Sequence, residues 1–210
     1  MNMDDVSLRL EEIKSILPKG VDPKIKRFHS TVPFKIISIR DALLHRLVNL
    51  GDEAVMLHGH QSLIPFLLTV RACLETAALI FSLNRYIESA LNNDSLDQLT
   101  GQLQRTALGS RNATTGFDSV NILGAIDKLE KLYPGIRKHY ENLSEYCHPN
   151  FEGVLCSYSD LTEENEFSYM LQAERVKIGE APLKIALISG LHAYDCARAN
   201  YKKLVEHYYA

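Results

Sequence analysis

Two charged residues stand in the middle of the most apolar part of the sequence. Arg71 and Glu75 are the only charged residues between Gln61 and Asn84, and their spacing of four places them on one face of a helix. A helix that is apolar nearly all round is buried on most sides, so its charges must pair or line a cavity. One interpretation is a pocket wall, in which Arg71 binds an anion and Glu75 orients it or acts as a base. The other is a structural ion pair that braces a neighbouring helix.

A second candidate group lies at the end of a later helical stretch, Tyr140 to Gly153, YENLSEYCHPNFEG. Pro149 disfavours the helical conformation for the residue before it, so we expect this helix to end at His148. The dipole of a helix tends to keep an imidazole at its C-terminal end protonated, which suits an anion contact or a general acid. The alternative is a capping histidine that bonds to the last carbonyl groups. Asn150 can close the turn that follows with its side chain.

If the two groups converge, they form one small polar pocket. We assign to it Arg71, Glu75 and His148 as catalytic residues, and Ser144, Tyr146 and Asn150 as ligand-binding residues. Such a pocket would bind a small phosphate-bearing or carboxylate ligand. In an enzymatic form it would cleave RNA without a metal ion, with His148 as general acid or base and Arg71 stabilising phosphate charge. The alternative is a non-enzymatic interaction or scaffolding module in which these residues are structural, so the sequence leaves open whether the chain is an enzyme.

Signals for metals and cofactors are weak. Glu145 and His148 have the Glu-x-x-His spacing of di-iron carboxylate bundles, but the sequence has no second copy. It also has no CxxC pair, no Walker loop, no GxGxxG and no nucleophile elbow. We therefore expect no metal site and no cofactor. The four cysteines are interpreted as reduced thiols of a cytoplasmic protein.

Composition and charge narrow the class of partner. The chain is 46% hydrophobic and 23% charged, which is ordinary for a soluble globular protein. Its net charge of −3 argues against bulk electrostatic binding to nucleic acid, although a local basic pocket for a small anion or RNA is compatible with it. The stretch from Ser62 to Leu83 has the length of a membrane span, but charges at a bilayer centre are costly. We expect a buried core helix and no membrane partner.

Helical periodicity dominates the elements that must position these residues. We assign residues 1–32 to an N-terminal helix and linker, and 33–210 to a single helical bundle domain. Helices are expected at about 34–57, 65–91, 95–108, 120–132, 135–147 and 182–209. A period of two in 153–159 and 166–172 predicts a β-hairpin within 153–173. The predicted fold class is all-α, a mostly antiparallel bundle with a small hairpin before the long C-terminal helix, with a homodimer through the long helices as one option.

One pair of residues matches a known motif in its letters. Arg40 and His45 form an Arg-x4-His pattern like that of the HEPN (higher eukaryote and prokaryote nucleotide-binding) helical domains. Many of those domains are metal-independent ribonucleases. The resemblance implies that His45 would handle the ribose hydroxyl proton and Arg40 the phosphate. The surrounding leucines favour a core position instead.

Two longer stretches, RACLETAALIFSL and YENLSEYCHPNFEG, resemble an uncharacterised group of bacterial all-helical proteins. These often carry an Arg-x3-Glu helix and a later LSxxxHxN helix end, and some are distantly HEPN-like. The matching residues are Arg71, Glu75, Ser144, His148 and Asn150. The resemblance implies a shared helical core and a shared pocket, with no established activity. Because no Arg-x4–6-His ends at His148, Arg71 would have to replace the local arginine from another helix.

Overall fold

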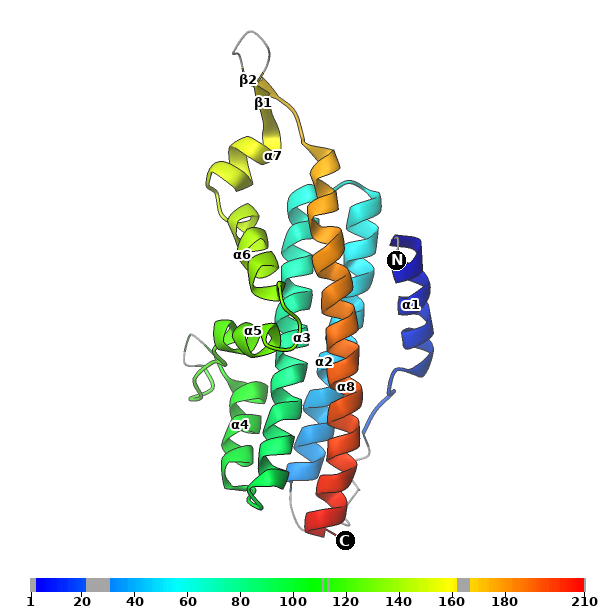
Figure 1. Ribbon diagram of the computed structural model, residues 1–210, viewed down its shortest axis with the longest axis vertical. Helices are drawn as coiled ribbons and strands as arrows, with labels where there is room; N and C mark the ends of the chain where they lie inside the picture. The colour runs from blue at the N-terminus through cyan, green and yellow to red at the C-terminus, as the bar shows by residue number, and fades with distance from the viewer. Residues whose placement is uncertain (1–2, 22–30, 111, 113, 162–166, 210) are drawn as a thin grey trace.

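The computed structural model describes residues 3–21, 31–110, 112, 114–161 and 167–209. The helices are α1 (Met3–Ile16), α2 (Val32–Gly59), α3 (Leu63–Asn92), α4 (Asp97–Leu108), α5 (Ile122–Glu130), α6 (Ile136–Cys147), the π-helical turn η1 (Phe151–Leu155), α7 (Cys156–Tyr158), the 3-10 helix η2 (Ala173–Gly179) and α8 (Glu180–Tyr209). The strands are β1 (Ser159–Leu161) and β2 (Phe167–Tyr169). The predicted class, a helical bundle with a small hairpin before the C-terminal helix, is confirmed (Figure 1).

Helix α3 is the centre of the bundle, because its apolar surface has neighbours on most sides. It packs against α8, α2, α5 and α6. Figure 1 shows α2 and α3 running in opposite directions, whereas α3 and α8 run the same way because α4 to α6 carry the chain back along the bundle. By length and composition α3 could also cross a membrane, but 56% of its most apolar stretch is buried inside the bundle.

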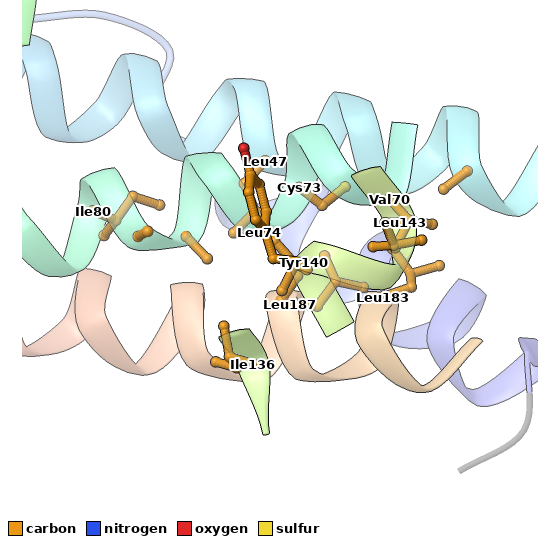
Figure 2. Close-up of a cluster of buried hydrophobic side chains, with 14 of the residues drawn as sticks. Leu47, Val70, Cys73, Leu74, Ile80, Ile136, Tyr140, Leu143, Leu183 and Leu187 are labelled. Carbon is orange, nitrogen blue, oxygen red and sulfur yellow. The ribbon is translucent and has the colours of Figure 1, made fainter. Parts of the chain in front are cut away.

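The apolar stripes of the long helices meet in a core around the middle of α3. Leu47 of α2, Leu74 of α3, Leu143 of α6 and Leu187 of α8 belong to one buried cluster (Figure 2). Burying a leucine side chain contributes about 1.5–3 kcal/mol, so this cluster holds α6 firmly against α3. The position of α6 decides which of its side chains reach the charged pair on α3.

The N-terminal helix joins the same core. Val6, Leu10 and Ile13 of α1 are buried in the cluster that surrounds α3, and α1 packs against α2. Part of the linker predicted after this helix, residues 22–30, lies outside the described residues.

The hairpin is shorter than predicted, and its first strand begins later. Ser159 pairs with Tyr169 in an antiparallel ladder, but most of the predicted strand 153–159 is helical. Asn150 caps this helical turn, because its Oδ1 accepts a hydrogen bond of 3.0 Å from the Gly153 N–H. A Cβ atom at position 153 would collide with the His148 carbonyl oxygen, so only glycine allows the turn to pack against the end of α6. The alternation of apolar residues in 153–159 therefore predicted a strand where the structure has helical turns.

Candidate functional site

Arg71 and Glu75 are held together by a residue from another helix. The Nη2 atom of Arg71 donates a hydrogen bond of 2.9 Å to the hydroxyl of Tyr140, and that hydroxyl donates one of 2.9 Å to Oε1 of Glu75. The direct separation between Nη2 and Oε1 is 3.4 Å. The guanidinium also lies over the Tyr140 ring, with its Cζ atom 5.0 Å from the ring centre. Tyr140 thus bridges the pair and ties α6 to α3.

The pair is not sealed inside the bundle. The Arg71 and Glu75 side chains are 29% and 30% exposed, whereas Tyr140 is buried within the apolar cluster (Figure 2). Both charged residues line an open cleft of about 460 Å³ between α3, α4 and the start of α5. The other lining residues are Leu79, Arg105, Thr106, Gly109, Val120 and Ile122. The cleft therefore contains two arginines and one glutamate.

One N–H donor of Arg71 lacks a partner among the described residues. A guanidinium carries five N–H donors, and Tyr140 takes one hydrogen bond from it. Its Nε atom is buried without a hydrogen-bond partner in the described part of the chain. A buried donor without a partner is costly.

The electrostatics of the pair keep its arginine charged and its neighbouring thiol neutral. Burial acts to lower the pKa of Arg71, but the bond to Tyr140 and the charge of Glu75 outweigh it, so the pKa is raised. Burial raises the pKa of the Cys147 thiol, and the Arg71 guanidinium offsets only part of that rise. The neutral thiol form of Cys147 is therefore favoured beside the pair.

His148 ends its helix as predicted, but the structure does not bring it to the charged pair. Helix α6 ends at Cys147, and the backbone of His148 is extended, with φ −95° and ψ 149°. Its side chain is exposed and makes no hydrogen bond or ion pair with any residue that the structure describes. The extended backbone before Pro149 turns the chain away, so the preceding residue, Cys147, is the one whose thiol interacts with Arg71.

The three predicted ligand-binding residues have partners within the chain. The hydroxyl of Tyr146 accepts a hydrogen bond of 3.4 Å from Arg175 of η2. The Ser144 hydroxyl donates to a backbone carbonyl one turn earlier in α6, and Asn150 caps η1 through Gly153. None of the three lines the cleft at Arg71. A helix turns by about 100° per residue, so Tyr146 faces η2 while its neighbour in sequence faces α3.

The side chains of the HEPN-like pair, Arg40 and His45, have separate partners in the structure. Arg40 is buried beside Asp41, with its Nη2 2.7 Å from the carboxylate oxygen Oδ1, and it lies over the ring of Tyr194. His45 is exposed, and its Nε2 lies 2.7 Å from the carbonyl oxygen of Pro18. Five residues along a helix correspond to about 140° of rotation beyond one full turn, which explains why the two side chains diverge.

Sequence reasoning missed Tyr140 and Arg105. Tyr140 follows the helical spacing of the apolar residues of α6, and its ring lies in the core. Only its hydroxyl belongs to the site. The spacing of apolar residues predicts a buried ring but does not predict which residues its hydroxyl contacts. Arg105 comes from α4, and no spacing in the sequence links it to Arg71. Within the described ranges, no group of three or more His, Cys, Asp or Glu side chains could hold a metal ion.

Comparison with known proteins gives no information about the family or function of the chain. No protein-family model matches the chain, and neither does any curated protein or any solved structure. The resemblance to HEPN-like bacterial proteins stays a prediction, and the geometry of the cleft alone carries the functional argument.

Proposed function

We propose that the cleft at Arg71 binds a small anionic ligand, of the phosphate-ester or carboxylate class. The observation that carries this proposal is a partly exposed guanidinium, held by Tyr140 and Glu75, that lines an open cleft. Guanidinium groups that are held in place suit such ligands, because their planar donors match the oxygens of phosphate and carboxylate groups.

The charges of the residues that line the cleft favour an anionic ligand over a cationic one. Arg71 and Arg105 contribute two positive charges and Glu75 one negative charge, so the lining has a net positive charge. Val120 and Ile122 also line the cleft, which places the start of α5 there. The N-terminal end of a helix carries partial positive charge and adds to the field of the two arginines.

Calorimetric titration with two probes, AMP and citrate, tests the proposal. We expect at least one of them to bind, and Arg71→Gln to weaken that binding by roughly 10- to 100-fold, the effect of losing one charged hydrogen-bond partner. Arg85→Gln is the matched control, because Arg85 lies on the same helix, is exposed and pairs with Glu88 outside this cleft. Thermal melting of both variants checks the fold. If neither probe binds, or if both variants bind alike, the proposal is wrong.

The ribonuclease hypothesis needs a separate test, because RNA cleavage requires a group that transfers the hydroxyl proton. A fluorescently quenched RNA oligonucleotide incubated with the native chain and with His148→Ala addresses it. Cleavage that is lost in both His148→Ala and Arg71→Gln would establish a catalytic form of the site. If the oligonucleotide binds without being cleaved, the site is a binding site for phosphate groups only.

A further inference from the structure

A second cleft adjoins the one at Arg71. It has a volume of about 340 Å³ and is lined by residues of α3, α4 and α5, together with the segment just before α5. We call it the Lys128 cleft. Arg105 and Val120 line both clefts, so Arg105 stands at their junction. A ligand held in one cleft can therefore extend into the other.

The residues that α3 contributes show that the two clefts lie end to end. Arg71, Glu75 and Leu79 line the first cleft, and Ser82 and Tyr86 line the second. Spacings of three and four residues place all of them on one face of α3, and α4 and α5 both lie beside this helix (Figure 1). At 1.5 Å per residue, Tyr86 is about 16 Å beyond Glu75 along the helix axis. A single phosphate or carboxylate group is too small to occupy both clefts.

The charges of the Lys128 cleft are all positive. Among the described residues that line it, Arg105 and Lys128 are the only charged ones. Neither side chain forms an ion pair or a hydrogen bond with a residue that the structure describes, whereas Arg85, for example, pairs with Glu88 at 2.7 Å. A cleft that is lined by charges of one sign concentrates ions of the opposite sign. The Lys128 cleft therefore suits an anionic group of its own.

The other polar side chains of the Lys128 cleft are uncharged. They include the hydroxyl of Ser119 and the amides of Gln102 and Asn121. The Oδ1 atom of Asn121 accepts a hydrogen bond of 3.1 Å from the Gly124 N–H, and its amide nitrogen is left as a donor. Hydroxyl and amide groups match the hydroxyls of a sugar or another polyol, because both kinds of group donate and accept hydrogen bonds.

We infer that the ligand is a polyol bisphosphate, such as a sugar with a phosphate at each end, and that it occupies both clefts. One phosphate would bind at Arg71 and Arg105, and the other at Arg105 and Lys128. The hydroxyls of the spacer would face the uncharged polar side chains. This inference rests on the proposed function, since the first phosphate uses Arg71, and it adds the class of ligand and Lys128 as a second binding residue.

Calorimetric titration of the native chain with fructose 1,6-bisphosphate, fructose 6-phosphate and pyrophosphate tests this inference. The two sugar phosphates differ by one phosphate group, and pyrophosphate carries two phosphates without a spacer. We expect the bisphosphate to bind about tenfold more tightly than either of the others, a difference of about 1.4 kcal/mol, because its second phosphate binds intramolecularly once the first is held. Equal binding of the two sugar phosphates, or equal binding of pyrophosphate and the bisphosphate, would overturn the inference.

Variants then locate the second phosphate. Lys128→Gln should weaken binding of the bisphosphate by about fivefold or more, as expected for the loss of one charged hydrogen-bond donor. Lys131→Gln is the matched control, because Lys131 is exposed, follows α5 directly and lines neither cleft. Equal effects of the two substitutions would contradict the inference. If AMP or citrate binds through Arg71 while the bisphosphate has no advantage, this inference alone is wrong. If none of these anions binds, the proposed function is wrong and the inference fails with it.

Discussion

The hydroxyl of Tyr140 should stabilise the fold through the charged pair, and Tyr140→Phe removes this hydroxyl while keeping the ring in the core. The substitution deletes the hydrogen bond from Arg71 and the hydrogen bond to Glu75, each 2.9 Å long. The ring continues to fill its place beside the core leucines, so no cavity forms. The measured effect therefore reports the bridge and not the packing.

The expected magnitude follows from the exposure of the two partners. A hydrogen bond to a charged group contributes about 1.5–3 kcal/mol, which would suggest a large combined effect. However, the Arg71 and Glu75 side chains are about 30% exposed, so water can replace the lost hydroxyl. Their nearest atoms are also only 3.4 Å apart and can pair directly. We therefore expect a loss of about 1–2 kcal/mol, or a Tm decrease of roughly 2–8 °C for a chain of this size.

Urea unfolding followed by circular dichroism measures this loss. Tyr158→Phe is the control, because the Tyr158 side chain is exposed and its hydroxyl has no hydrogen-bond partner among the described residues. A double-mutant cycle with Glu75→Gln should give a coupling free energy of about 0.5 kcal/mol or more, as residues in one hydrogen-bond network do. If Tyr140→Phe behaves like the control, or if the coupling is absent, the bridge contributes nothing and the reasoning fails.

Three further predictions concern the core. Asp41→Ala should cost about 3 kcal/mol or more in urea unfolding, because it leaves the buried guanidinium of Arg40 without its partner; a cost below about 1 kcal/mol would contradict this. Gly190→Ala should destabilise the fold by about 1–3 kcal/mol, because the new Cβ would lie 2.5 Å from Leu47 Cδ2. An unchanged midpoint of urea unfolding would contradict this and would show that α8 can shift at no cost. Burial raises the pKa of Cys73 to about 12, so near pH 8 only about one thiol in ten thousand is ionised. Ellman's reagent should then modify Cys73 last, and only after unfolding, whereas modification at the rate of the other thiols would contradict the burial.

The helices and the fold class could be predicted from the sequence, because apolar spacing of three and four residues is a local property of the chain. The boundaries of α2, α3 and α8 lie within two residues of the predicted ones. The same locality explains why Arg71 and Glu75 could be identified as a pair, since two charges in an otherwise apolar helix must find partners. The hairpin could be expected, but its first strand could not be placed, because capping by Asn150 and the close approach at Gly153 override the alternation.

Two residues of the candidate site, Tyr140 and Arg105, are brought to it by tertiary structure alone. Tyr140 reaches the pair because its ring is packed on the bundle core, and Arg105 reaches the cleft because α4 lies beside α3. A shared pocket required His148 to converge with the pair, but at the end of α6 its extended backbone leaves it in solvent. A sequence specifies which residues share a helix face, whereas the packing of one helix on another specifies which face meets which. For that reason the paired charges could be found in the sequence, while the residue that bridges them and the second cation of the cleft could not.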